Sequence, residues 1–438
     1  MKLNRTPISD LKEGKYVKVA GVVKNIKDLG KIKFLELCDE QGKVQLTIKP
    51  EIYSGDEINV NNIPKYTFVE CEGNVCKGLW KKGYEIEVKK LTLLGNVKKP
   101  LPIDPKPLKD PSAPSLDKRL DYRWIDLRVR KNRIPLYILS DFIKNCRDFL
   151  YSEGFTEIFT PKLMGTASES GSEVFPVFYF DKEAFLAQSP QFYKQMAICS
   201  SFEKVFEVGP VFRANPSFTT RHDTEFTSFD VEFAYIESHH DVMNLEEKML
   251  KYSLKNIKEK WDKEIKEISG RDLNVPKKIP RIKMEEAYEI VDREDVNEDG
   301  ELRPSGEMKI ATHVKEEYGT DFVFVTDYPW ETRPFYHMKG ESMEDGTPTT
   351  RSFDLIYRGV EITTGAQREH RYEILKNQIM EKGLRPEELE YYLEFFKYGA
   401  PPHGGFGLGP TRVITAMLEL KNVRNATFIP RDPKRLKP

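Results

Sequence analysis

A proline-rich segment near residue 100 divides this chain into two parts of different character. Residues 97–107 read Val-Lys-Lys-Pro-Leu-Pro-Ile-Asp-Pro-Lys-Pro. Proline removes a backbone donor and favours extended conformations, so the segment is typical of a linker. The 438 residues suffice for two or three domains. We therefore predict a small domain at residues 1–96, a hinge at 97–118 and a larger domain at 119–438.

The small domain shows the alternation of apolar and polar residues that predicts β-strands. Five such runs occur, at residues 17–23, 33–37, 43–48, 67–73 and 84–88. The second and third flank Asp39-Glu40-Gln41-Gly42, a hairpin turn signal. Five short strands in about 80 residues favour a small closed barrel of the OB-fold type.

Helical and strand patterns alternate in the larger domain, which favours an α+β multidomain protein. Apolar spacing predicts helices over Leu136–Ser152, with Gly154 as a stop signal, over Leu245–Lys260 and over Arg371–Lys382. Residues 320–365 are β-rich. Residues 261–320 have few apolar blocks, and we mark them as a candidate insertion.

Arginines beside glycine-rich or loop sequence are the main chemical signal. Arg213 lies in Val-Phe-Arg-Ala, Arg221 precedes His222, and Arg412 closes the glycine-rich run that begins at Gly404. A guanidinium stays charged and its planar fork suits phosphate oxygens. We therefore expect a nucleoside triphosphate held by arginine side chains. The runs match neither a Walker loop nor a Rossmann fingerprint. Taken alone, a glycine cluster also fits a turn or a tight packing point.

Composition excludes several other classes. Hydrophobic residues make up 39% and charged residues 32%, as in soluble globular proteins. No apolar run is long enough for a membrane span and the first residues lack a signal-peptide core, so we expect a cytoplasmic protein that contacts no membrane. The five cysteines form no C-x-x-C pair and the histidines have no H-E-x-x-H spacing, which argues against a zinc site.

Three segments, in chain order, resemble motifs 1, 2 and 3 of the class II aminoacyl-tRNA synthetases: residues 154–161, 212–226 and 405–412. In that family, motif 1 is a strand ending in proline at a dimer interface. Motif 2 is a pair of antiparallel strands with their loop, and motif 3 is a strand entering a helix. The resemblance implies a catalytic domain built on an antiparallel β-sheet flanked by helices, and a homodimer.

Finer signatures resemble the aspartyl branch of that family, in its archaeal and eukaryotic form. They are residues 188–195, 362–368 and the chain end at 428–438. This resemblance implies that L-aspartate is activated with ATP, with Mg²⁺ on the phosphates, and is then transferred to tRNA-Asp. It leaves open whether tRNA-Asn is charged as well.

The resemblance also implies roles for individual residues around ATP. The expected ATP contacts, with Arg213 and Arg412 as the catalytic pair, are Arg213, Arg221, His222, Phe226, Glu361 and Arg412. Asp354 and Glu361 are the expected Mg²⁺ ligands. They lie seven residues apart in a β-rich stretch, where alternation would put them on opposite faces, so we expect a bend near Gly359.

Further roles follow for the amino acid and the anticodon. The expected aspartate contacts are Glu169, Gln191, Lys194, Asp230 and Arg368, with Glu169 on a Gly/Ser-rich mobile loop. Two cations, Lys194 and Arg368, would penalise asparagine, whose amide is neutral. Without the surrounding signature, a salt-bridged surface lysine would be the favoured interpretation of Lys194. Phe34, Gln45 and Glu85 match anticodon contacts, although Phe34 alone also fits a barrel core position.

Three positions depart from the family motifs. Asn215 replaces the glutamate after Phe-Arg-x in motif 2, Thr411 replaces the glutamate before the motif 3 arginine, and Cys38 replaces an arginine common in the barrel. A catalytically silent, tRNA-binding paralogue is therefore one alternative. The asparagine enzyme is a closer alternative, and Lys194 with Arg368 separates it from the aspartate enzyme.

Overall fold

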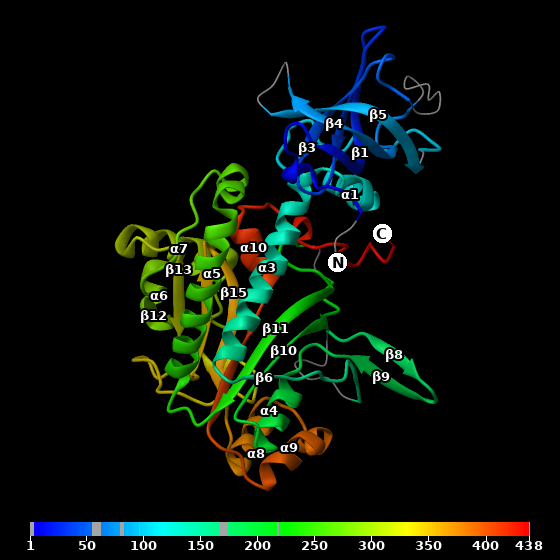
Figure 1. Cartoon of the computed structure of the whole chain (residues 1–438). Helices are drawn as coiled ribbons and strands as arrows, with labels where there is room; N and C mark the ends of the chain where they lie inside the picture. The colour runs from blue at the N-terminus through cyan, green and yellow to red at the C-terminus, as the bar shows by residue number, and fades with distance from the viewer. Residues whose placement is uncertain are drawn as a thin grey trace. The chain divides into compact units, whose positions relative to one another are not determined.

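The computed structural model describes residues 4–54, 63–78, 83–95, 97–165, 173–216 and 219–437. The chain forms two compact units, Met1–Asp104 and Pro105–Pro438, which divide inside the proline-rich segment (Figure 1). Each unit has its own hydrophobic core.

The first unit is a five-stranded closed barrel, which confirms the predicted OB-fold. Its strands, paired in the order β1-β2-β3-β5-β4, are β1 (Tyr16–Asp28), β2 (Lys33–Cys38), β3 (Lys43–Ile48), β4 (Phe68–Lys77) and β5 (Tyr84–Gly95). A short 3₁₀ turn, Ile8–Asp10, precedes them. Alternate residues such as Leu35, Leu46 and Ile86 fill the barrel and are fully buried. Their neighbours in sequence therefore lie on its outer surface.

The second unit is built on an eight-stranded sheet among the described residues, in the order β12-β13-β14-β15-β16-β11-β10-β6. Its strands are β6 (Thr156–Glu157), β10 (Lys204–Phe212), β11 (Glu225–Ala234), β12 (Arg281–Lys283), β13 (Phe322–Thr326), β14 (Ser352–Tyr357), β15 (Val360–Gln367) and β16 (His403–Leu408). The pairs are antiparallel except at the two edges, where β12 and β6 run parallel to their neighbours. The predicted antiparallel sheet is therefore confirmed. A separate three-stranded sheet comprises β7 (Leu163–Met164), β9 (Lys182–Leu186) and β8 (Pro176–Tyr179).

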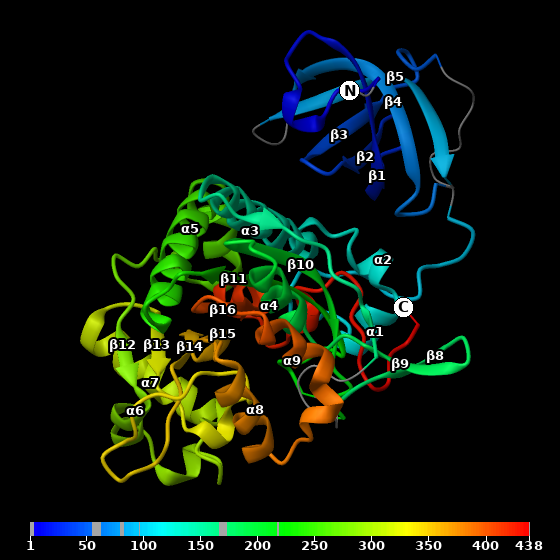
Figure 2. The same cartoon turned by 90° about the horizontal axis from the view of Figure 1, so that it is seen from below.

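Helices flank the large sheet, as predicted. They are α1 (Leu116–Asp121), α2 (Arg123–Asp126), α3 (Arg130–Ser152), α4 (Gln191–Cys199), α5 (His239–Ser269), α6 (Met284–Ile290), α7 (Pro304–Tyr318), α8 (Tyr372–Glu381), α9 (Glu390–Lys397) and α10 (Pro410–Met417). Short 3₁₀ turns occur at Arg293–Asp295, Trp330–Thr332, Pro386–Leu389 and Val423–Asn425. The long helices α3 and α5 lie side by side across the sheet (Figure 1), while α4, α8 and α9 gather in a separate cluster (Figure 2).

Helix α5 is longer at both ends than the sequence prediction. Ser238 caps its start, in a capping box with Asp241, and Gly270 ends it with φ 80°. Trp261 and Ile265 continue its buried stripe beyond Lys260. The candidate insertion therefore begins inside α5, and its remainder supplies β12, α6 and α7 to the unit.

The large sheet has one face for the core and another for polar groups. On β11, Phe229 and Val231 pack into the core with α3 and α5. Asp230 and Glu232 alternate with them and therefore lie on the opposite face. The same holds on β14, where Leu355 belongs to that core and Asp354 does not. The polar face carries the candidate site.

None of the helices in the described part of the chain is both long enough and apolar enough to span a membrane.

Candidate active site

The phosphate-binding candidates lie close together on the polar face. Arg213 directly follows β10, and its guanidinium carbon lies 5.6 Å from the centre of the Phe226 ring on β11. His222 is exposed, yet its pKa is lowered to about 4. Partial desolvation lowers it most, followed by the positive charges of Arg412, Arg213 and Arg221, and together they outweigh Glu361, which raises it. These influences place residues from motif 2 and motif 3 around one point. They also leave the His222 ring neutral at pH 7.

Glu361 connects motif 3 to the hairpin of β14 and β15. Arg412 donates from Nη1 to the Glu361 carbonyl at 3.1 Å and to its Oε1 at 3.2 Å. Partial burial raises the pKa of Glu361, but Arg412, Arg333 and Arg213 outweigh burial and hold the pKa below its usual value. About a third of the side chain, 34%, is exposed. Glu361 is therefore an ionised carboxylate that a ligand can reach.

The expected bend near Gly359 is a complete chain reversal. Arg358 and Gly359 both have positive φ, 51° and 75°, as a tight hairpin turn requires. The turn places Glu361 on the strand antiparallel to Asp354, which pairs with Thr364. The Thr364 hydroxyl donates to Glu361 Oε1 at 3.3 Å. The two acids therefore come from neighbouring strands, as the sequence expectation requires.

Asp354 is held by a cation that sequence reasoning missed. Arg333 donates to both of its carboxylate oxygens, at 3.1 and 2.6 Å, and both side chains are almost fully buried. The guanidinium carbon of Arg333 lies 3.7 Å from the centre of the Tyr328 ring. Arg333 lies in the loop before β14, where no motif marks it. Asp354 therefore holds Arg333 in place and is less accessible than Glu361.

Two more carboxylates, also missed, adjoin this cluster. Glu307 on α7 accepts from Arg221 Nη1 at 2.8 Å and from the backbone N–H of Glu361 at 3.0 Å. Burial, outweighing Arg221, raises the pKa of Glu307 to about 7. Burial and the nearby acids also raise the pKa of Glu301 to about 7, because together they outweigh Arg333, which lowers it. Glu307 therefore holds the partly exposed Arg221 side chain at the rim of the site.

The amino-acid candidates form a second buried cluster on the same face. Lys194 and Gln191 lie one turn apart on α4. Lys194 Nζ is 3.0 Å from Asp230 Oδ1 and 3.4 Å from Glu232 Oε2, yet it makes no hydrogen bond of good geometry among the described residues. Its side chain is 1% exposed, which excludes the alternative of a surface ion pair.

Arg368 completes this cluster from the end of β15. It donates from Nε to Glu232 Oε1 at 3.0 Å and from Nη2 to Gln191 Oε1 at 3.2 Å. Its Nη1 lies 2.8 Å from His337 Nε2. Burial raises the pKa of Glu232, but Arg368 and Lys194 outweigh burial and lower it. Glu232, also missed from the sequence, thus joins the two cations in a fully buried centre.

The glycine run of motif 3 acts as a tight packing point, one of the two readings left open by the sequence. Gly404 and Gly405 lie in strand β16 and not in a phosphate loop. A Cβ on Gly405 would lie 2.0 Å from the Val231 carbonyl oxygen and 2.5 Å from Glu232 Oε2. The glycine therefore leaves room for the Glu232 carboxylate.

The anticodon candidates share one outer face of the barrel. Gln45 donates to Glu85 Oε2 at 2.9 Å, and their strands β3 and β5 pair at these two residues. Phe34 on β2 is half-buried and lies outside the barrel core, unlike Leu35. Phe34 is therefore not a residue of the barrel core, which was the alternative interpretation from the sequence.

Other sequence candidates are less informative. Glu169 lies outside the described residues. Thr411 is buried at the start of α10, and Asn215 is half-buried just after β10. Cys38 is half-buried at the end of β2, opposite Lys43.

Comparison with known proteins gives this arrangement its context. Residues 115–433 match the family described as "tRNA synthetases class II (D, K and N)", and residues 17–94 match "OB-fold nucleic acid binding domain". The chain is 43% identical to an aspartate–tRNA(Asp) ligase of Pyrococcus abyssi, covering 98% of both chains. It is 42% identical to an aspartate–tRNA(Asp/Asn) ligase of Aeropyrum pernix, covering 97% of this chain and 96% of the relative.

Solved structures agree. An asparaginyl-tRNA synthetase of Pyrococcus horikoshii complexed with asparaginyl-adenylate matches over the full length of both chains, with a TM-score of 0.90 and 31% identity. An aspartyl-tRNA synthetase of Entamoeba histolytica matches with a TM-score of 0.85 and 30% identity, covering 100% of this chain and 93% of that one. An OB-fold barrel and a class II catalytic sheet define an aminoacyl-tRNA synthetase. This chain belongs to the class II tRNA synthetases of the D, K and N group.

Proposed function

We propose that this protein is an aspartate–tRNA ligase. The observation that carries the proposal is the pair of buried cations, Lys194 and Arg368, that meet at Glu232. The side-chain carboxylate of aspartate can accept from both. Asparagine would place a neutral amide there and leave charge unpaired in a buried site, which is costly. Lys194 is suited to this role because its ammonium group makes no well-formed hydrogen bond in the described structure.

The ammonium group of the substrate needs acceptors nearby. Asp230 lies 3.0 Å from Lys194, and Gln191 is within reach of Arg368, so both adjoin the proposed carboxylate site. We assign Asp230 and Gln191 to the substrate ammonium group, with Glu169 as a further contact. With its side-chain carboxylate and its ammonium group held by these adjacent contacts, the substrate would be free to turn its α-carboxylate toward the nucleotide site.

The nucleotide site follows from the arginines of motifs 2 and 3. We assign Arg213 to the α-phosphate and the reacting carboxylate, and Arg412, Arg221 and His222 to the γ-phosphate end. Phe226 offers an aromatic face for adenine, next to the Arg213 guanidinium at 5.6 Å. A neutral His222 would donate a hydrogen bond, and the incoming anion would raise its pKa.

The donor set also fits a magnesium ion bound through ATP. Mg²⁺ usually takes one or two carboxylates together with phosphate oxygens and waters. Glu361 is ionised and partly exposed, so it fits this role; Asp354, whose oxygens both accept from Arg333, would support it from behind. When bound, the ion would neutralise phosphate charge.

The chemistry needs no protein nucleophile. The α-carboxylate of aspartate attacks the α-phosphorus of ATP, and pyrophosphate leaves, which yields aspartyl-adenylate. A ribose hydroxyl of the tRNA then attacks the acyl carbon, and AMP leaves. Arg213 and Arg412 contribute by holding two anions together and by stabilising charge as it develops.

The barrel and the sheet edge account for the macromolecular partners. Phe34, Gln45 and Glu85 form an outer surface that suits stacking and hydrogen bonding of anticodon bases of tRNA-Asp. Strand β6 ends the large sheet, and Phe159 just beyond it is 82% exposed. An edge strand beside an exposed aromatic residue favours a homodimer contact. We place the protein in the cytoplasm.

Amino-acid-dependent exchange of pyrophosphate into ATP tests this proposal. Exchange with aspartate, and little with asparagine, is expected. Exchange with asparagine would favour the asparaginyl alternative, and no exchange would favour the silent paralogue. Aminoacylation of purified tRNA-Asp and tRNA-Asn with aspartate then shows whether one or both tRNAs are substrates.

A further inference from the structure

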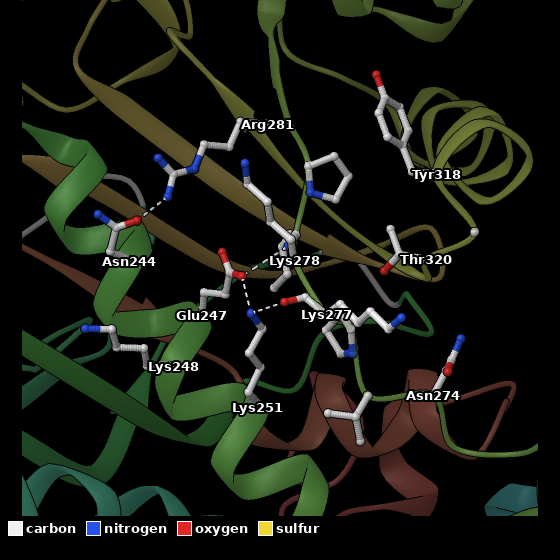
Figure 3. A pocket seen from close by; sticks show the side chains of 15 residues that line it. Asn244, Glu247, Lys248, Lys251, Asn274, Lys277, Lys278, Arg281, Tyr318 and Thr320 are labelled. Atoms are coloured by element: carbon white, nitrogen blue, oxygen red, sulfur yellow. Dashed lines mark hydrogen bonds and ion pairs between the residues drawn. The ribbon is translucent and has the colours of Figure 1, made fainter.

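A groove of about 1150 Å³ lies between α5 and the segment that leads to β12 (Figure 3). Its charged lining consists of five cations and one carboxylate, a net charge of +4. The carboxylate, Glu247, is already paired with Lys251 at 2.6 Å. The whole chain has a net charge of −1, so this concentration of positive charge is local.

The cations on α5 extend beyond the groove as a row. Lys248, Lys251, Lys255 and Lys258 recur at intervals of three or four residues and therefore share one face of the helix. Lys248, Lys255 and Lys258 are exposed and form no ion pair within the described residues. At 1.5 Å per residue the row spans about 15 Å. A row of this length suits an extended polyanion better than a single phosphate group.

The facing segment adds cations on a fixed backbone. Lys277 and Lys278 are exposed, and neither forms an ion pair in the described part of the chain. The neighbouring Ile279 is fully buried and donates its N–H to Glu247 Oε1 at 3.3 Å, while Lys251 donates to the Lys277 carbonyl. Arg281, at the groove end, donates to Asn244 Oδ1 at 2.6 Å. The backbone that carries Lys277 and Lys278 is therefore fixed against α5, and their exposed side chains extend from a set position.

We propose that this basic stripe, the α5 row with Lys277, Lys278 and Arg281, binds the phosphate backbone of double-stranded RNA. Helix α5 covers the core face of the sheet, whereas Asp230 and Glu232 lie on the other face. The stripe is therefore a second RNA site, separate from the catalytic pocket. Lysines that contact phosphates give affinity without base readout and release counterions, so binding depends steeply on salt.

The test uses the full chain and a fluorescent, blunt RNA duplex of 16 base pairs, which presents no unpaired bases and no tRNA acceptor end. The triple variant Lys248→Gln, Lys277→Gln, Lys278→Gln is expected to bind about tenfold or more weakly at low salt. Its plot of log affinity against log salt should be shallower by about 2 to 3, because each lost phosphate contact removes about 0.9. The Lys→Arg triple should retain both properties.

A matched control is Lys118→Gln, Lys263→Gln, Lys421→Gln, which removes three exposed lysines outside the stripe. It should bind the duplex like the parent protein, and all variants should keep parental aspartate-dependent pyrophosphate exchange. Equal weakening by both triples, or parental binding by the stripe triple, would overturn the proposal. So would binding of inorganic tripolyphosphate at the stripe without binding of the duplex.

The source of the RNA can be separated in the same variants. A raised KM for tRNA in the stripe triple would identify the duplex as part of the tRNA substrate. An unchanged KM alongside weakened duplex binding would identify a different RNA. Both results support the stripe as an RNA site.

Discussion

Replacing Lys194 with methionine removes one buried cation from the amino-acid pocket while keeping a side chain of similar length. In the parent, Lys194 and Arg368 together balance Asp230 and Glu232. In the variant, Arg368 alone faces two carboxylates. Removing one partner of a buried ion pair typically costs about 3–5 kcal/mol of stability.

The same change should reduce kcat/KM for aspartate. Truncating a buried, hydrogen-bonded charge partner costs about 2–5 kcal/mol in binding, which corresponds to roughly 30-fold to several thousandfold. Activation of asparagine should change less, so the aspartate-to-asparagine ratio falls. Pyrophosphate exchange with each amino acid, measured beside thermal unfolding, gives both quantities.

A second substitution separates the two effects. Adding Glu232→Gln to Lys194→Met leaves Arg368 facing one carboxylate instead of two, and this balance of charge should recover melting temperature without restoring selectivity for aspartate. As a control, Lys315→Met breaks the ion pair of Lys315 with Asp321 at 2.8 Å, far from the pocket chemistry, and should cost below about 1 kcal/mol. If the double variant regained aspartate activity, Lys194 would serve only to neutralise Glu232 and the reasoning would fail.

Three further predictions follow from the same geometry. Arg412→Gln should raise KM for ATP about 10- to 100-fold, because a hydrogen bond to a charged group is worth about 1.5–3 kcal/mol. Pyrophosphate exchange measured at varied ATP gives this KM, and an unchanged value would show that Arg412 does not contact the nucleotide. Gly405→Ala should lower the free energy of unfolding by at least about 3 kcal/mol, since the new Cβ would lie 2.0 Å from a backbone oxygen. The Cβ of Gly407→Ala would lie 3.4 Å from Asp230 Oδ1, so this control should cost below about 1 kcal/mol, and equal losses in thermal unfolding would contradict the packing argument. Burial, with Asp354 adding to it, raises the pKa of Glu246 to about 8 from 4.5, so the folded state keeps a proton that the unfolded state releases. Stability should therefore fall as the pH rises from 4.5 to 8. Glu246→Gln should flatten the dependence of melting temperature on pH between pH 5 and 8, and an equally steep decline in the variant would refute the assignment.

The sequence predicted the elements that repeat a simple pattern. The five barrel strands alternate around residues such as Leu35 and Leu46, and each begins within one residue of its expected start, although β1 and β5 continue five and seven residues beyond their expected ends. Helix α8 keeps helical spacing and lies within one residue of its expected limits. Helix α5 was underestimated because its start depends on a side-chain cap at Ser238 and its last turns carry only sparse apolar residues. Helix α3 also begins earlier than expected, at Arg130, and accommodates Pro135 in its second turn.

The site residues also fall into those that the sequence predicted and those that it did not. Residues within recognisable motifs, such as Lys194 and Arg412, could be found from the sequence because the resemblance marks them. Arg333, Glu307 and His337 could not, because each lies in a segment without a motif and reaches the site only through tertiary packing. Glu232 carries a weak signal, since it continues the alternation that begins with Ser228 and Asp230 on β11.

A crystal structure with a non-hydrolysable aspartyl-adenylate analogue would test the central claim most directly. We expect the side-chain carboxylate of the analogue within hydrogen-bond distance of both Lys194 and Arg368, with adenine against Phe226 and the phosphate beside Arg213. An analogue whose carboxylate lies elsewhere, while Lys194 contacts only Asp230 and Glu232, would contradict the proposed selection of aspartate.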